Sequence, residues 1–347
     1  MNIKNLKFGG MISENYDKKL NNKRLLKINE LSFSHGRSAM IWLVRNNKFK
    51  NCLLCNYTWP AIPDLMKKLN LKVKFYDLFE KNIFNKLNKI KGETLLILPI
   101  FYGFKPWLDY IALEKKVNSN VHILLDGAQT AFAYNQYILP KHGSILSCPH
   151  KSLGVNDGAI LKISNLSLPQ LNDYNSLKRE NEFLKIKKIS RKLLNSGNKS
   201  LENKDFKLSK KLEENWASTP EKKISITSLN RFKTINQQFH LKERIRKFHF
   251  LKKHFEKYKI VPNNLELGCP FGFPILHKKR DKLIKLLHKE RVYATSLWSK
   301  NKYVTSKFKN SKLYSKQFLA LPLDQRYSID DLNEMVSRVK RALDKLN

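Results

Sequence analysis

The sequence has few acidic residues, few cysteines and no long apolar run. Only 29 Asp and Glu stand against 67 Lys and Arg, which leaves a net charge of +38. The longest strongly apolar run, residues 95–101, is far shorter than the ~20 residues that a membrane-spanning helix needs. The first ten residues contain no apolar segment typical of a secretory signal. We therefore expect a cytoplasmic protein without a membrane span.

The positive charge would by itself suggest nucleic acid or another anionic surface as a partner. However, only 13 of the 67 basic residues are Arg, and the Lys residues are spread along the chain among many Asn and Ile. This pattern is typical of drift in a genome rich in A and T. Attraction of an anionic small substrate and binding of nucleic acid are the alternatives. The sequence contains no nucleic-acid-binding motif, so we do not expect nucleic acid as a partner.

The four cysteines do not form a zinc-site pattern. Cys52 and Cys55 are spaced as Cys-x-x-Cys, but no second pair exists to complete a site of the double-pair kind. A redox-active pair usually opens a helix, whereas this pair lies in the apolar string NCLLCNY, which predicts a strand. We predict that both are buried and apolar in character, and we expect no metal site.

Short apolar segments alternate with helical patterns between residues 36 and 163. Strands are predicted at 51–55, 73–77, 95–101, 121–126, 144–148 and 159–163. Helices are predicted at 37–46, 61–70, 79–90 and 106–117. Continuously apolar strands that alternate with helices indicate an α/β fold, in which helices sandwich a mostly parallel sheet.

The rest of the chain predicts a connection and a second, smaller domain. Residues 164–235 are polar and rich in Lys, Asn and Ser, and we interpret them as a connecting region of a large domain, 1–235. Residues 236–347 predict a small α+β domain. Its helices are expected at 235–255 and 280–290 and its strands at 269–277, near 291–298 and at 318–323. Ser328 and Asp331 form a capping box for a final helix. The apolar stripe of that helix is Ile329, Leu332, Met335, Val336, Val339, Leu343 and Leu346.

Residues able to do chemistry follow several predicted strands. Asp126 ends one strand, Lys151 follows the next, and Trp59 follows the strand at 51–55. The stretch 36–38 begins the first helix, where free N–H groups favour anions. Each has an ordinary explanation as a turn residue, a surface cation, a core residue or a helix cap. The ordered set is more specific, because ligands bind at the carboxyl ends of parallel strands.

The set resembles fold-type-I pyridoxal-phosphate (PLP) enzymes, and among them the DegT/DnrJ/EryC1/StrS sugar aminotransferase family. The most specific matches are DGAQ, residues 126–129, and SCPHKSLG, residues 147–154, which looks like the family's lysine loop. SHGRSAM looks like its phosphate-contacting turn, and NYTWPAI looks like the stretch with the aromatic residue that stacks on the cofactor. LALPLDQRYSIDDL looks like the family's C-terminal pattern. The resemblance runs almost end to end.

The resemblance implies a role for each matched residue. Lys151 would hold PLP as a Schiff base, and Asp126 would keep the pyridine nitrogen protonated. Gln129 would lie near the ring hydroxyl, and Trp59 would stack on the ring. The phosphate would be held by Gly36, Arg37 and Ser38, with Ser147 as a further candidate.

Two features of the lysine loop depart from the family pattern. Ser147 lies four residues before Lys151, where the family has five, which weakens its match to the phosphate ligand. His150 adjoins Lys151, and some relatives carry His in place of the lysine and catalyse a dehydration. The downstream sequence SLGVNDGA fits the family best when Lys151 takes the lysine position.

The resemblance implies an aminotransferase that passes an amino group, from glutamate in most of the family, to a nucleotide-linked keto sugar. Such an enzyme would serve surface polysaccharide or related biosynthesis, and enzymes of this kind are commonly homodimers. A PLP-dependent sugar dehydratase, another PLP enzyme on the same fold, and a non-catalytic relative are the alternatives, because a fold does not fix its function.

Overall fold

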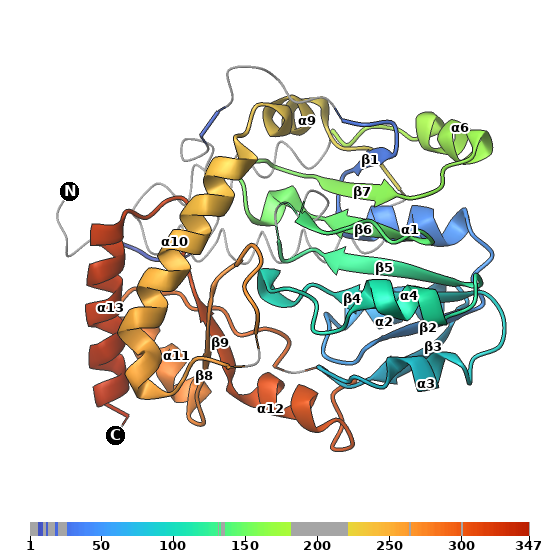
Figure 1. Cartoon of the computed structure of the whole chain (residues 1–347). Coiled ribbons are helices and arrows are strands. Elements are labelled where there is room, and N and C mark those ends of the chain that lie inside the picture. Colours follow the sequence, from blue (N-terminus) through green and yellow to red (C-terminus); the bar gives the residue numbers. More distant parts are fainter. Residues whose placement is uncertain are drawn as a thin grey trace.

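The apolar segments of the first half form one seven-stranded sheet in the computed structural model (Figure 1). The structure describes residues 6–9, 12, 18–19, 26–130, 132, 136–181, 221–263, 265–299 and 301–346. The sheet has the order β1-β7-β6-β5-β4-β2-β3. Its strands are β1 (Glu30–Phe33), β2 (Asn51–Cys55), β3 (Lys72–Tyr76), β4 (Thr94–Pro99), β5 (Val121–Gly127), β6 (Gly143–Ser147) and β7 (Ala159–Ile163).

The predicted mostly parallel sheet is confirmed, with one strand reversed. The pairs from β3 through β2, β4 and β5 to β6 are all parallel. β7 runs antiparallel to both β6 and β1. Only residues 148–158 separate β6 from β7, and their one helical turn is the 3-10 turn η4 (Pro149–Lys151). A parallel crossover needs a dozen or more residues, usually with a helix, so this short link returns antiparallel.

Helices lie on both faces of the sheet, as predicted. They are α1 (Gly36–Arg45), α2 (Ala61–Lys68), α3 (Ile83–Leu87), α4 (Tyr110–Lys116) and α6 (Leu168–Ser176). Strands β2, β4 and β6 are buried along their whole length, which explains their continuous apolar sequences. The helix predicted at 79–90 is much shorter, because Phe79 has a φ of 61° and cannot belong to a right-handed helix.

The C-terminal part lies beside the edge at which β5 ends (Figure 1). It contains α9 (Ile226–Lys233), α10 (Gln237–Phe255), β8 (Phe273–Leu276), α11 (Arg280–Lys289), α12 (Lys309–Gln317), β9 (Phe318–Leu321) and α13 (Ile329–Asp344). β8 and β9 form an antiparallel pair. The capping box of α13 is confirmed, and five of the seven stripe residues are buried, Ile329 and Leu346 being partly buried.

Two sequence expectations fail in this region. Residues 291–298 form only the isolated bridges of Val292 with Phe8 and of Thr295 with Ala320, so the predicted strand there is wrong. α12 was not predicted, because its sequence KNSKLYSKQ is polar and carries no clear apolar stripe. The boundary at 235/236 stays a prediction. Much of the predicted connecting region, residues 182–220, lies outside the described residues.

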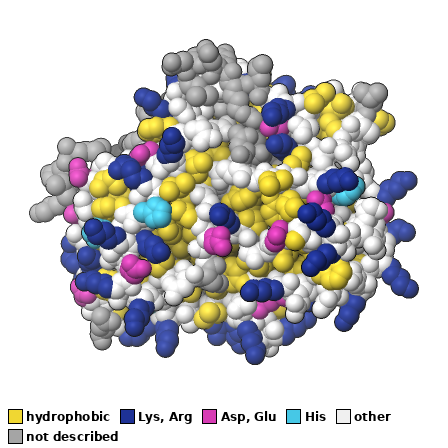
Figure 2. Space-filling view, viewed as in Figure 1, with side chains coloured by type: hydrophobic (Ala, Val, Ile, Leu, Met, Phe, Trp, Pro, Cys, Tyr) yellow, Lys and Arg dark blue, Asp and Glu magenta, His cyan; other side chains and the backbone are white. Residues whose placement is uncertain are grey.

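The cysteines and the charges behave as expected. Cys52 and Cys55 lie buried in β2, and burial raises the pKa of both thiols. Lys and Arg side chains are scattered over the whole visible face, around apolar side chains near its centre (Figure 2). Within the described ranges, no helix is long and apolar enough to cross a membrane.

Candidate active site

The carboxyl ends of β1, β4, β5 and β6 share one edge of the sheet, because these strands run in the same direction. In Figure 1 the arrow of β5 points along this direction, toward α10. The register pairs Asp126 of β5 with Leu146 of β6, and Gly127 with Ser147. The sheet therefore places the Asp126 turn beside the start of the lysine loop, residues 148–158.

Asp126 is a partly buried acid, and one of its carboxylate oxygens has no hydrogen bond to the described residues. Its Oδ1 accepts a hydrogen bond from the backbone N–H of Ala128 at 3.0 Å, and Oδ2 has no partner among the described residues. Burial raises the pKa of Asp126, while the Ala128 N–H and the charge of Lys151 act to lower it. A cationic or N–H group that reached Oδ2 would therefore stabilise the ionised form.

Lys151 ends the turn η4 and has an exposed side chain. Its charge acts on Asp126 and also on Cys148, whose pKa burial raises to about 11. The loop behind it is fixed at two points. His150 Nδ1 lies 2.7 Å from the Gly158 carbonyl, and the Asp157 carboxylate accepts the N–H and hydroxyl of Ser225 at 2.8 and 2.6 Å. Lys151 is thus an exposed amine on an anchored loop.

Gln129 has one half of its amide engaged. Its Oε1 accepts the backbone N–H of Tyr102 at 3.1 Å. No hydrogen bond from its Nε2 to any described residue is present, so the N–H₂ group can donate to a ligand oxygen. This arrangement fits the predicted contact with a ring hydroxyl.

The first turn of α1 packs directly on the lysine loop. A Cβ at Gly36 would lie 2.9 Å from Cys148 Sγ, so only glycine allows this approach. The Ser38 N–H donates to His35 Nδ1 at 2.9 Å, and the Ser38 hydroxyl, fully buried, accepts the Lys222 N–H at 3.3 Å. Arg37 is the cationic member of the predicted trio, and a guanidinium can bind a phosphate through two parallel hydrogen bonds.

Arg37 and Trp59 form a stacked pair. The guanidinium carbon of Arg37 lies 4.7 Å from the centre of the Trp59 ring, and Arg37 is only 7% exposed. Such cation–π contacts are strengthened by exclusion of water. One face of the aromatic plate that was predicted to stack on a cofactor is therefore covered by Arg37.

The chain resembles solved aminotransferase structures over nearly its whole length. A putative PLP-dependent aminotransferase from Bacillus cereus matches with a TM-score of 0.59 at 16% identity, over 90% of this chain and 85% of that chain. A putative sugar aminotransferase from Streptococcus pneumoniae, solved in its PMP form, matches with a TM-score of 0.66 at 11% identity, over 92% and 88%.

A third match is the Helicobacter pylori aminotransferase PseC, which is involved in the biosynthesis of pseudoaminic acid. Its TM-score is 0.64 at 13% identity, over 91% of this chain and 87% of that chain. The chain has the fold of the PLP-dependent aminotransferases. No protein-family model and no curated protein matches the sequence.

Within this aminotransferase fold, six of the eight predicted residues border the carboxyl edge through loops or a helix start. Asp126 and Ser147 lie within the last two residues of strands β5 and β6, and Ser147 is completely buried. The ring of His150 contacts the Gly158 carbonyl and so stabilises the lysine loop. It is therefore poorly placed to replace Lys151 as the residue that meets the cofactor. The roles of all these residues toward a cofactor stay predictions.

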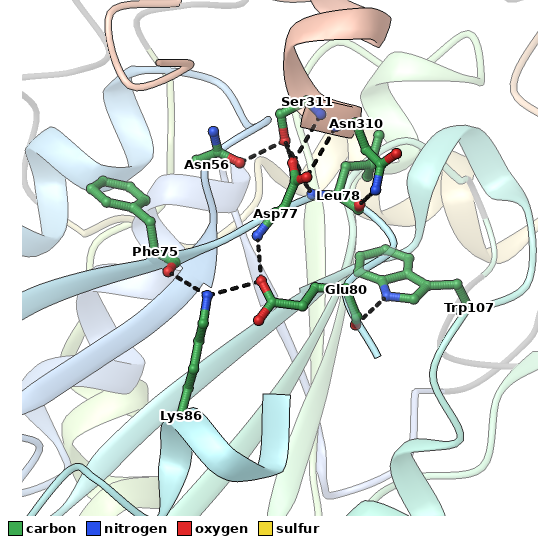
Figure 3. A network of polar contacts seen from close by, with 9 residues as sticks. All are labelled: Asn56, Phe75, Asp77, Leu78, Glu80, Lys86, Trp107, Asn310 and Ser311. Atoms are coloured by element: carbon green, nitrogen blue, oxygen red, sulfur yellow. Dashed lines mark hydrogen bonds and ion pairs between the residues drawn. The ribbon is translucent and has the colours of Figure 1, made fainter. Parts of the chain in front are cut away.

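Sequence reasoning missed the residues that hold the Trp59 loop, residues 56–59. Asn301 Nδ2 donates to the carbonyls of Asn56 and Thr58 at 2.9 and 2.7 Å. Ser311 Oγ, at the start of α12, lies 2.6 Å from both Asn56 Oδ1 and Asp77 Oδ1, and its hydroxyl can donate to either acceptor (Figure 3). Asp77 directly follows β3, and this position after a strand is the signal that the sequence offers. Its carboxylate also accepts the N–H groups of Leu78 and, 234 residues away, of Ser311.

Two cavities do not coincide with this edge. One of about 640 Å³ is lined by residues that include His122, His142 and Glu93, and one of about 500 Å³ is lined by Glu114 and Lys141 among others. Both lie at the amino-terminal ends of the central strands, away from Lys151. Among the residues that the structure describes, no cluster of His, Cys, Asp and Glu could hold a metal ion.

Proposed function

We propose that this protein is a PLP-dependent aminotransferase that transfers an amino group, from glutamate, to a nucleotide-linked keto sugar in surface polysaccharide or related biosynthesis. The observation that carries the proposal is the placement of Asp126 at the end of β5 and of Lys151 just beyond the end of the adjacent parallel strand β6, where the charge of Lys151 acts on Asp126. It occurs within a fold shared with sugar aminotransferases, at the edge where such sheets bind ligands.

The residues present fit PLP. Asp126 offers a carboxylate oxygen for the pyridine nitrogen, and its raised pKa makes a cationic partner favourable. Gln129 offers an amide donor for the ring hydroxyl. Lys151 offers an exposed amine for covalent attachment. The acid, the amide and the amine thus match the pyridine nitrogen, the ring hydroxyl and the carbonyl carbon of the cofactor, respectively.

When bound, PLP supplies an electron sink for the carbon that carries the amino group. Lys151 Nζ would hold the cofactor carbonyl carbon, give it up to the incoming amino donor, and then move the proton between the donor's Cα and the cofactor. Asp126 Oδ2 would keep the proton on the ring nitrogen throughout.

We assign the phosphate group to Arg37, whose guanidinium can bind it through two parallel hydrogen bonds. Trp59 would orient this guanidinium through the observed stack, and the other face of its ring would remain for the cofactor. The N-terminus of α1 adds a favourable dipole. The role of Ser147 is the weakest part of the assignment, since its side chain is buried within the sheet.

The keto-sugar substrate is proposed from the sugar aminotransferases among the similar structures. A nucleotide-linked sugar carries a diphosphate, which the excess of 38 positive charges would attract. We further propose a homodimer in the cytoplasm, as the resemblance implies.

The test is the absorbance spectrum of the purified protein with added PLP, followed by borohydride reduction and peptide mapping. We expect a visible band that reduction removes, with the cofactor fixed to the peptide that holds Lys151. Addition of L-glutamate before reduction should abolish the band. A Lys151→Ala variant should neither form the band nor retain the cofactor, whereas Lys141→Ala, on the opposite edge, should behave as the wild type. A Lys151→Ala protein that keeps the band would refute the assignment.

A further inference from the structure

Arg244 of α10 is a completely enclosed cation, only 2% exposed. Its guanidinium makes four hydrogen bonds to three separate segments. Nη2 donates to the Ser152 carbonyl at 3.2 Å and to Gln325 Oε1 at 3.0 Å. Nη1 donates to the carbonyls of Pro270 and Phe271, both at 3.2 Å. The side chain therefore joins the lysine loop to two segments of the C-terminal part.

The first of these contacts lies next to Lys151. The Ser152 carbonyl also accepts Gln325 Nε2 at 2.9 Å, so it receives two donors from two different segments. Gln325 in turn is held by Arg244 through the other half of its amide. These bonds fix the Ser152–Leu153 peptide unit, one residue beyond Lys151, and so hold the backbone that carries the lysine.

The other contacts lead to Gln129. Phe271, whose carbonyl Arg244 binds, donates its own N–H to the Tyr102 carbonyl at 2.9 Å. Tyr102 then donates its N–H to Gln129 Oε1 at 3.1 Å. This approach is tight, because any Cβ at Gly103, where φ is 78°, would collide with the Cys269 carbonyl. One continuous path of hydrogen bonds thus connects the Lys151 loop with Gln129 through Arg244.

The geometry requires arginine and not merely a positive charge. A guanidinium presents five N–H donors in a rigid plane, and here its two Nη atoms serve acceptors on different segments. A lysine would offer three donors from a single point and could not span them. The buried carboxylate of Asp324 balances the charge nearby, since Arg244 helps to lower the pKa of that acid.

We propose that Arg244 is a positioning residue that sets Lys151 in register with Gln129 and Asp126. It touches neither cofactor nor substrate and acts through the Ser152 and Phe271 carbonyls. The proposal rests on the proposed function, because it assigns Arg244 the placement of the amine that attacks PLP. Misplacement of a reacting group by about 1 Å can cost roughly 100-fold in rate.

The experiment compares Arg244→Lys with Arg246→Lys, using PLP as the probe. Arg246 lies two residues further along α10, is exposed, and pairs with Glu243 at 2.8 Å, so it is a matched control. Three quantities are measured well below the melting temperature of each protein: the rate of PLP capture, trapped by borohydride; the circular dichroism of the bound cofactor; and hydrogen exchange of residues 148–155 without PLP.

We expect Arg244→Lys to capture PLP roughly 10- to 100-fold more slowly, with a changed circular dichroism and faster exchange confined to the lysine loop and residues 268–272. Arg246→Lys should match the wild type in all three. A merely structural role would lower the melting temperature without changing the capture rate, the circular dichroism or local exchange below it. Wild-type behaviour of Arg244→Lys in these readouts would overturn the proposal.

A Gln325→Leu variant decides the matter if Arg244→Lys does not fold. It removes one donor to the Ser152 carbonyl and leaves the Arg244 bonds to residues 270 and 271 in place. Slower capture with faster loop exchange would support the proposal, and wild-type values would refute it. Should the wild type capture no PLP at Lys151, the proposed function fails and the positioning proposal with it. If the wild type and every variant capture PLP at the same rate, the proposed function is retained and only the positioning role of Arg244 is rejected.

Discussion

The two edges of the central sheet differ, because hollows lie at one edge and residues able to do chemistry lie at the other. The amino edge holds two hollows, of about 640 and 500 Å³, and His122 and His142 line the first of them. The carboxyl edge brings together Asp126, Lys151, Gln129 and the Arg37–Trp59 pair. The two hollows would point to the first edge and the side-chain chemistry to the second.

The difference follows from how the chain reaches each edge. At the carboxyl edge the C-terminal part packs across the strand ends through Arg244, Asn301 and Ser311, which fill space and fix the loops. At the amino edge, the residues that line the two hollows come from strand ends, loops, α4 and α6.

The largest expected effect concerns Asp126 and its counterpart on the opposite edge, Glu93. Asp126→Asn should weaken PLP binding by roughly 100- to 1,000-fold, because loss of one partner of a buried ion pair costs about 3–5 kcal/mol. Glu93 is exposed and lines the larger cavity, so Glu93→Gln should leave the affinity unchanged. Equilibrium titration of each protein with PLP measures both. Equal PLP affinities of the wild type, Asp126→Asn and Glu93→Gln would show that the carboxyl edge does not bind PLP in preference to the amino edge.

A second effect separates two carboxylates, the partly buried Asp126 and the buried Asp324. Burial acts to raise the pKa of Asp324 as well, but the charge and hydrogen bonds of Arg326 hold it below its usual value. Asp324 therefore stabilises the fold above the ordinary carboxyl pKa, and this contribution is lost as pH falls through its lower folded pKa. Asp324→Asn should reduce the free energy of unfolding at pH 7 by about 3 kcal/mol.

Asp126→Asn should do the opposite in the cofactor-free protein. Burial raises the pKa of Asp126 in the folded protein, so its ionised form destabilises the fold above that pKa. This destabilisation disappears below the ordinary carboxyl pKa. The Asn variant should be more stable than the wild type at pH 7, and the difference should fade in acid. Urea denaturation of both variants between pH 3 and pH 7 tests the pair, and destabilisation by Asp126→Asn at pH 7 would contradict the assigned cause.

The smallest effect is expected at the amino edge. Burial lowers the pKa of His122 to about 4, and its Nε2 lies 3.0 Å from Ser144 Oγ. The neutral ring is thus favoured, and the protein should lose stability as pH falls from 6.5 toward 4, by at most ~1.4 kcal/mol per pH unit. His122→Gln, which keeps a partner for Ser144, should show a shallower decline in urea denaturation at pH 7 and pH 5, with unchanged PLP binding. Identical slopes would show that His122 does not carry the acid sensitivity.

The sequence predicted the strands that are apolar throughout and the residues that follow them. Asp126 and Lys151 could be found because Asp126 ends one strong strand signal and Lys151 follows the next within a few residues. β1 could not, because ELSF is short and begins with a charged residue, and α12 could not, because its stripe is weak. The stacking of Arg37 on Trp59 joins the first turn of α1 to the loop after β2, and the sequence around either residue does not indicate this contact.

By itself, the sequence determined the alternation of strand and helix, the parallel core of the sheet and the order of the candidate residues, since periodicity and burial are local properties of the chain. The tertiary structure decided which of those residues meet. It gave Ser38 an internal partner, buried Ser147, and brought Arg244 and Gln325 to the Ser152 carbonyl. These contacts span up to 173 residues of sequence, and a hydrogen bond depends on distance in space, which no local pattern encodes.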